Sequence, residues 1–448
     1  MINKEELLKK AQKPAQDALR LHPFYQGKIE VDLKASVRSY DDFGVWYSPG
    51  VAAPCKEIAE NPEAVYKHTN KGNFVAVVSD GTRVLGLGDI GAEASMPVME
   101  GKALLFKYLG GVDAFPICVD TKDPDKLIEF VKMLQPSFGG INLEDISQPK
   151  CFYILDRLRK ECRIPVWHDD QQGTATVTLA GLINALRCVG KELKDVTITF
   201  IGAGAANVCI SNLIFFAGAD PAKCFVVDSK GILNKDRVEE LREKGYPQKA
   251  DLAAKTNAEG RTGGMAEAIR GADVVISLSQ SGPDVIKNEW VKTMNDKAII
   301  FACANPIPEI WPWEAKEAGA YIVATGRSDF PNQVNNSICF PGIFRGVLDV
   351  QASTITDEMC VTAAQTIADL GVEIGMGPDN LLPTMDNVEV FIRQAVEVGL
   401  KAIELGIAKK KYTREELRAK VEKSVYRARN VTQLLMDNDF IPAPPAEE

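Results

Sequence analysis

The feature that most constrains the fold of this chain is a regular alternation, from residue 74 onward, of short apolar runs with segments of helical spacing. The apolar runs are rich in β-branched residues and are bounded by turn residues, which is typical of buried strands. Strands and helices that alternate in this way form right-handed units around a parallel sheet. We expect strands at 74–80, 83–91 (glycine-rich and leading into a loop), 112–120, 139–145 and 164–170, and helices at 98–111, 123–134 and 150–162.

A second unit of the same kind begins near residue 191 with a β-branched strand, a glycine turn and an apolar helix. This order is the Rossmann pattern, in which glycines let the backbone approach a pyrophosphate at the start of the helix. Asn207 stands where the pattern has its third glycine or alanine, and Asp228 follows Gly202 by 26 residues, where an acid reads the ribose. The residues expected to bind a dinucleotide are Gly202, Ala203, Gly204, Ala205, Ala206, Asp228, Ser229 and Lys230.

After residue 340 the pattern changes to helices, at 356–371, 387–408 and 413–429, which we expect to cover the sheet or to form a subunit contact. The sequence therefore predicts an α/β fold with three parts. An N-terminal α/β domain with a parallel sheet spans 1–165, a Rossmann dinucleotide-binding domain spans 166–345, and a C-terminal helical region that packs on both spans 346–448.

Acidic residues end three consecutive strands of the first unit: Asp120, then Glu144 and Asp145, then Asp169 and Asp170. The carboxyl ends of parallel strands meet at one edge of a sheet, which is where ligands bind. Carboxylates that converge without compensation are costly, so we expect a divalent cation between them. Oxygen ligands favour Mg²⁺ or Mn²⁺. Neighbouring strand residues point to opposite faces, so Asp169 and Asp170 should have different partners.

Composition excludes several other classes of function. The 448 residues carry a net charge of −9 and no basic cluster, so nucleic acid is not an expected partner. No apolar run reaches the length of a membrane span, and the N-terminus lacks the apolar region of a secretory signal. Ten scattered cysteines without a CxxC pair indicate free thiols, hence a reducing compartment and a cytoplasmic location.

Eight motifs between about residues 40 and 406 resemble those of the malic enzyme family, in its small prokaryotic form. They are VWYSPGVAAPC, VSDGTRVLGLGDIG, VMEGKALLFK, INLEDI, HDDQQGTA, FIGAGAAN, CANPIPEI and DFPNQVNNSICFPGIFRG. The resemblance implies oxidative decarboxylation of (S)-malate to pyruvate and CO₂ with reduction of NAD or NADP and a requirement for Mg²⁺ or Mn²⁺. It also implies a homodimer, in which the partner subunit contributes Tyr47 to the site.

The resemblance assigns roles to residues that single motifs leave open. It implies a general base, Lys102, and a general acid, Tyr47. Asp169, which should point away from Asp170, is expected to face Lys102 or a nearby helix terminus and to position the base. It implies three metal ligands, Glu144, Asp145 and Asp170, and four residues that bind malate, Arg83, Asn305, Asn335 and Asn336. Each of these taken alone has a plainer explanation as a cap, a turn former or a solvated side chain. His168 receives no role.

The nucleotide and the outcome of the reaction stay open at this point. Asp228 favours NAD, whereas Ser229 and Lys230 can hold a 2′-phosphate, and the balance leans slightly to NADP. A malolactic enzyme, which releases lactate and retains NADH, has the same framework. An oxaloacetate decarboxylase without a redox step has no need of the Gly202 turn, and a non-catalytic nucleotide-binding protein has no need of Lys102 and Tyr47.

Overall fold

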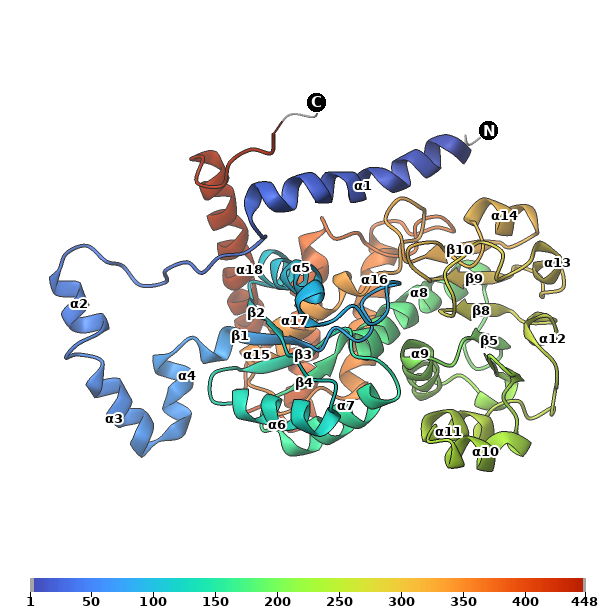
Figure 1. Ribbon diagram of the computed structural model, residues 1–448, viewed down its shortest axis with the longest axis horizontal. Helices are drawn as coiled ribbons and strands as arrows, with labels where there is room; N and C mark the ends of the chain where they lie inside the picture. The colour runs from blue at the N-terminus through green and yellow to red at the C-terminus, as the bar shows by residue number, and fades with distance from the viewer. Residues whose placement is uncertain (1–3, 446–448) are drawn as a thin grey trace.

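The chain was analysed as a computed structural model that describes residues 4–445. It contains two separate sheets, each accompanied by helices (Figure 1). No helix within the described residues combines the length and apolar character needed to cross a membrane. The α/β class, the Rossmann-type second unit and the C-terminal helices are as the sequence predicts.

The first sheet has four parallel strands in the order β2-β1-β3-β4. These are β2 (Asp113–Cys118), β1 (Phe74–Ser79), β3 (Gly140–Leu143) and β4 (Val166–His168). The connecting helices are α5 (Ala92–Gly110), α6 (Pro124–Leu134) and α7 (Lys150–Glu161). Local chemistry sets their ends: Asp123 caps α6 by accepting from the backbone N–H groups of Asp125 and Lys126, and Gly111 ends α5 in a left-handed conformation.

Two strand predictions for this sheet are wrong. Residues 83–91 form no strand and have only an isolated bridge between Val84 and Gly88, because the glycines of this segment bend it into a loop. The strand predicted over 164–170 ends at His168, and residues 169–173 form a π-helical turn that leads into α8 (Thr174–Val189). The domain boundary predicted at 165/166 separates β4 from β3, to which β4 is hydrogen-bonded.

The second sheet has the order β10-β9-β8-β5-β6-β7. Its parallel strands are β5 (Ile198–Ile201), β6 (Phe225–Asp228), β8 (Val274–Ser277), β9 (Ile299–Ala302) and β10 (Ile322–Thr325), and β7 (Gly231–Ile232) is antiparallel to β6. Almost every residue of the parallel strands is buried, as expected of a sheet covered on both faces. The main helices of this unit are α9 (Ala205–Phe216), α10 (Val238–Glu243), α11 (Pro247–Lys255), α12 (Met265–Ile269), α13 (Asn288–Val291) and α14 (Pro312–Glu317).

The C-terminal helices cover the first unit. They are α15 (Phe340–Asp349), α16 (Asp357–Glu373), α17 (Val388–Glu404) and α18 (Arg414–Asp437). α15 and α18 pack on α5, and α16 packs on α8. Phe340 and Phe344 of α15 contact the ring of Phe106 in α5, so α15 joins the core of the first unit.

The N-terminal segment forms an arm. After α1 (Lys4–Tyr25), an extended stretch leads to α2 (Asp41–Trp46), α3 (Ala52–Glu60) and α4 (Val65–His68), which reach outward from the body of the molecule (Figure 1). Neither α2 nor α3 has a buried residue. Large apolar side chains are instead exposed along this arm: Val31, Leu33, Tyr40, Phe43, Val45, Trp46 and Tyr47.

Candidate active site

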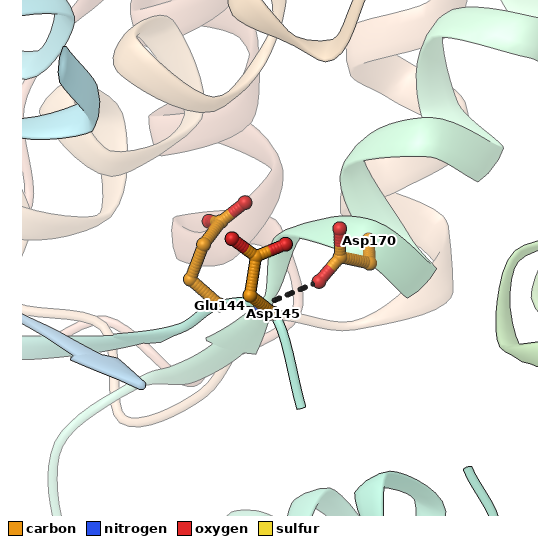
Figure 2. A group of neighbouring side chains, drawn as sticks. All are labelled: Glu144, Asp145 and Asp170. Atoms are coloured by element: carbon orange, nitrogen blue, oxygen red, sulfur yellow. Dashed lines mark hydrogen bonds between the residues drawn. The ribbon is translucent and has the colours of Figure 1, made fainter. Parts of the chain in front are cut away.

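Three carboxylates meet at the carboxyl edge of the first sheet. Glu144 and Asp145 directly follow β3, and Asp170 lies in the π-helical turn that follows β4 (Figure 2). One oxygen from each lies within 4.8 Å of the others. Asp145 has φ = 56°, a left-handed conformation that Asp tolerates, and its backbone N–H donates to Asp170 Oδ2 at 2.8 Å. Asp120, at the end of β2, is exposed and outside this cluster, so convergence of all three acidic strand ends is not found.

The electrostatics of the cluster fit a divalent cation. Burial and the nearby Asp170 raise the pKa of Asp145 to about 8. Burial also raises the pKa of Glu144 well above its usual range, against the opposing effect of Lys102. Asp145 Oδ2 is buried without a hydrogen-bond partner, which is rare for a carboxylate oxygen. Three oxygen ligands with one unpartnered atom suit Mg²⁺ or Mn²⁺.

Lys102 lies next to this cluster on α5. Its Nζ is 2.6 Å from Asp169 Oδ2, 3.1 Å from Glu144 Oε1 and 4.4 Å from the centre of the Phe340 ring. The Lys102 side chain is buried, which alone lowers its pKa, but the carboxylates of Asp169 and Glu144 outweigh burial and raise the pKa above its ordinary value. The contact between Lys102 and Asp169 is the one expected from the sequence.

The side chains of Asp169 and Asp170 point to different partners, but for a reason other than the strand alternation that we predicted. Both lie in the π-helical turn rather than on a strand, so helical rotation and not strand alternation separates their side chains. Asp169 accepts from Trp167 Nε1 at 3.0 Å as well as from Lys102. A Cβ at Gly173 would lie 2.0 Å from Asp169 Oδ1, so only glycine leaves room for this carboxylate.

His168 is fully buried, and neither ring nitrogen has a hydrogen-bond partner. Its Nδ1 lies 3.6 Å from Asp170 Oδ2, beyond hydrogen-bond range. Burial lowers the pKa of His168 despite the nearby aspartates. The imidazole is therefore neutral and packs beneath Asp170.

The residues expected to bind malate come from three segments of the chain. The Arg83 backbone N–H donates to the Asp145 carbonyl at 2.9 Å, and the Arg83 side chain is exposed. Asn336 lies against the π-helical turn, because a Cβ at Gly173 would be 3.3 Å from Asn336 Cβ. Asn335 Oδ1 is occupied as a cap by the N–H of Ser337 at 2.9 Å. Asn305 follows β9, and its carbonyl oxygen would lie 2.7 Å from a Cβ at Gly86.

Tyr47 is not part of this group in its own chain. It lies at the end of α2 in the arm, with 76% of its surface exposed. Figure 1 places α2 far from the ends of β3 and β4. Within the described chain, Tyr47 therefore does not join the acidic cluster.

The expected dinucleotide turn joins β5 to α9. Gly202 has φ = 96°, its N–H donates to the Val227 carbonyl at 2.8 Å, and α9 begins at Ala205 after the extended residue Gly204. A Cβ at Gly204 would find only Gln148 Nε2, at 3.9 Å, so the turn faces the loop that carries Glu144 and Asp145. Asn207 stands in place of the third glycine or alanine of the pattern, and its Nδ2 donates to the carbonyls of Ile201 and Gly202 at 2.8 and 3.0 Å. These hydrogen bonds within the turn explain the departure from the pattern.

Asp228 ends β6, and its carboxylate is already engaged. Arg237 donates to both of its oxygens, at 2.9 and 2.8 Å, and the Lys230 N–H donates to Oδ1 at 2.9 Å. Lys230 Nζ is 2.6 Å from Glu240, and Ser229 is exposed. Sequence inspection missed Arg237, because a residue nine positions after an acid belongs to no dinucleotide motif.

A cavity of about 620 Å³ opens beside this region, lined by residues 264–267, residues 280–285 and Trp290. Gly263 borders it and accepts from the Ile232 N–H at 2.9 Å, in the β6–β7 hairpin that follows Asp228. The cavity therefore lies on the Asp228 side of the glycine turn.

Comparisons with known proteins agree with this arrangement. Residues 26–159 match the family model "Malic enzyme, N-terminal domain", and residues 171–403 match "Malic enzyme, NAD binding domain". The chain is 48% identical to the bifunctional malic/malolactic enzyme of Bacillus subtilis over 91% of this chain and 98% of that protein. It is 49% identical to the NAD-dependent malic enzyme of Geobacillus stearothermophilus, over 86% and 78%.

Relatives named NADP-dependent malic enzyme include that of Escherichia coli, at 45% identity over 88% of this chain and 53% of that protein. Among solved structures, the malic enzyme of Entamoeba histolytica has a TM-score of 0.96 at 47% identity, covering 99% of this chain and 93% of that one. The two family models together match most of the chain, and the Bacillus subtilis relative is matched over almost its full length. The chain belongs to the malic enzyme family.

Proposed function

We propose that this protein converts (S)-malate to pyruvate and CO₂ with reduction of NADP or NAD. The observation that carries the proposal is a buried lysine, Lys102, held between carboxylates at a site that fits a divalent cation and faces a dinucleotide turn. When bound, Mg²⁺ or Mn²⁺ polarises the oxygens of malate, and the nicotinamide accepts a hydride from C2. Glu144, Asp145 and Asp170 would hold the cation, and Arg83, Asn305, Asn335 and Asn336 would orient malate.

Lys102 takes the proton of the malate hydroxyl. In the free protein the carboxylates keep Lys102 protonated. Glu144, Asp145 and Asp170 would hold a dication, whose charge would offset those of the carboxylates and would favour the neutral amine of Lys102, the form that accepts a proton. Asp169 holds Nζ in place at 2.6 Å and acts as a positioning residue.

The partner subunit's Tyr47 donates the proton that C3 receives after CO₂ leaves. Two observations support this assignment in a homodimer. Tyr47 is exposed at the end of α2, and it stands among apolar side chains that the described residues leave largely exposed. Exposed apolar surface of this extent marks a protein interface.

NADP is the proposed nucleotide, by a narrow margin. Both Asp228 oxygens accept from Arg237, which reduces the repulsion of a 2′-phosphate and adds a guanidinium beside it. Lys230 Nζ is also hydrogen-bonded to Glu240.

Ten free cysteines support a reducing compartment, and we propose the cytoplasm.

A malolactic reaction is the second candidate, because the Bacillus subtilis relative is named a bifunctional malic/malolactic enzyme. An absorbance assay at 340 nm with malate, NAD or NADP, and Mn²⁺ separates the possibilities. A rise that requires Mn²⁺ supports the malic enzyme reaction. Malate consumption with a flat trace and lactate as product supports the malolactic reaction. Activity on oxaloacetate without turnover of malate would refute both.

A further inference from the structure

Glu309 is a fully buried carboxylate that belongs to neither the acidic cluster nor the dinucleotide turn. It lies beyond β9, four residues after Asn305. Its Oε1 accepts from Ser277 Oγ at 2.8 Å and from the Ser279 N–H at 3.0 Å, and its Oε2 accepts from the Ala304 N–H at 3.0 Å. These three donors match an acceptor-only carboxylate.

The three donors come from the loops that follow two neighbouring strands. Ser277 ends β8, and Ser279 follows it, whereas Ala304 follows β9 and directly precedes Asn305. A single side chain thus ties the loops of two adjacent strand ends together at the edge where ligands bind.

Each of these loops touches a different part of the proposed site. The β8 loop lies against the dinucleotide turn, because a Cβ at Gly202 would be 2.7 Å from the Leu278 carbonyl oxygen and 3.1 Å from Ser279 Cα. The β9 loop carries Asn305, whose carbonyl oxygen closely approaches Gly86 of the first unit. Glu309 therefore connects the backbone beside the nucleotide turn to the backbone beside the malate-binding asparagine.

We propose that Glu309 is a positioning residue that fixes Asn305 relative to the dinucleotide turn, and so sets the distance between malate and the nicotinamide. The proposal rests on the proposed function, because Asn305 matters in this way only if it contacts malate. Glu309 touches neither ligand and acts through the Ala304 and Ser279 N–H groups.

Glu309→Gln is the sharpest test, because glutamine has nearly the same volume but carries a donor in place of one oxygen. The amide NH₂ must face either Ala304 N–H or Ser279 N–H, and the backbone donor it faces loses its acceptor. Misplacement of reacting groups by about 1 Å costs on the order of 100-fold in rate, so we expect kcat/KM for malate to fall about 10- to 100-fold. The Mn²⁺ activation constant should stay within about twofold, because the metal ligands belong to the other sheet.

Asp349→Asn is the matched control for a buried carboxylate. Asp349 is buried in α15 and accepts from Arg345 Nε and Nη2 at 2.9 and 2.8 Å. Arg345 in turn donates to Asn73, just before β1, and to the Gly111 carbonyl, so this pair lies at the opposite edge of the first sheet from the acidic cluster. This variant should lower Tm and leave kcat/KM unchanged.

Ser277→Ala is a second test, because it removes one donor to Glu309 without leaving a backbone group unpaired. It should fold, and it should reduce kcat/KM for malate by a smaller factor than Glu309→Gln.

The outcomes divide cleanly. The proposal is overturned if Glu309→Gln lowers Tm but leaves kcat/KM unchanged. It is also overturned if Glu309→Gln impairs Mn²⁺ activation as much as malate turnover. If Glu309→Gln does not fold, Ser277→Ala decides: an unchanged kcat/KM for malate overturns the proposal. If the wild-type protein shows no malate oxidation, the proposed function fails instead, and the affinity for NADPH, followed by its fluorescence, still tests the connection through Ser279 to Gly202. A Glu309→Gln affinity equal to that of the wild type would then refute it.

Discussion

Glu144, Asp145 and Asp170 lie close enough to destabilise one another when all are ionised. The pKa of Asp145 rises from 3.8 to about 8, chiefly through burial and then through Asp170. A group whose pKa is higher in the folded protein contributes stability below its unfolded pKa, and that contribution is lost as pH rises through the folded pKa. The metal-free protein therefore loses stability between about pH 4 and pH 8, in the range where the cation is needed.

This loss is measurable by unfolding in denaturant with EDTA present. We expect the free energy of unfolding of the wild type to fall relative to Asp145→Asn as pH rises from about 6 to 8, by at most about 1.4 kcal/mol per pH unit. Asparagine suits the control because it also tolerates the left-handed backbone of position 145. Mn²⁺ at about 100 times its Kd should add about 2.7 kcal/mol to the wild type. Parallel pH profiles for the two proteins in EDTA would contradict this account.

Asp170→Ala tests the metal assignment at a single residue. Asp170 is partly exposed, and its loss leaves only the Asp145 N–H without a partner, so the fold should persist. Turnover with Mn²⁺ should fall at least about 100-fold, because one of three protein ligands is gone. Circular dichroism checks the fold, and the malate assay checks turnover. Wild-type activity with Mn²⁺ would show that Asp170 is not a ligand.

At the residue scale, the sequence predicts those contacts that short motifs encode. The contact of Lys102 with Asp169 follows from a helix and a strand end brought to one edge, and the structure contains it. Glu309 lies in the motif CANPIPEI, but its contact with Ser277 was not found, because the two residues are 32 positions apart and come together only in the folded sheet. Arg237 was not found because it belongs to none of the motifs. The roles of Tyr47, Lys102 and the asparagines stay predictions.

At the scale of elements, alternation of strands and helices predicted both sheets, because buried strands and amphipathic helices have distinct periodicities. The failures have local causes. Residues 83–91 are apolar enough for a strand, but three glycines with positive φ or close neighbours make a loop that meets Asp145 and Asn305. The turn at 169–173 adopts π-helical geometry, which hydrophobic patterning does not report.

The ion pair between β6 and the segment before α10 sets the nucleotide preference in our proposal. Arg237→Leu frees the Asp228 carboxylate, which then bonds the ribose of NAD and repels a 2′-phosphate. We expect kcat/KM for NADP to fall about tenfold or more, with that for NAD unchanged or higher. Steady-state kinetics with both nucleotides provide the measurement. Lys230→Ala is the control, because Glu240 already engages that side chain and the change should be smaller. An equal fall in kcat/KM with both nucleotides would show that Arg237 does not set the nucleotide preference.

At the scale of the whole molecule, our proposal for Tyr47 requires that the exposed arm meets a second chain. Tyr47→Phe and Lys102→Ala should each be inactive alone, but mixing them in denaturant and refolding should restore about a quarter of wild-type activity, because half the dimers of a two-fold symmetric assembly then hold one intact site. Turnover after refolding provides the measurement, with each variant refolded alone as its control. If the mixture gains no activity over either parent, the sites are not shared in this way.

The close approach of Gly86 to Asn305 couples the two ligands thermodynamically. The Gly86 loop is fixed to the acidic cluster through the Arg83 N–H, and Asn305 is fixed to the nucleotide turn through Glu309. Malate that brings these loops together supplies free energy that the nucleotide would otherwise have to supply, so the nucleotide then binds more tightly. Linkage requires that malate tighten NADP binding by the same factor by which NADP tightens malate. Replacing Gly86 with alanine, whose Cβ would lie 2.7 Å from the Asn305 carbonyl oxygen, should abolish this cooperativity, measured as the ratio of NADP affinities with and without malate.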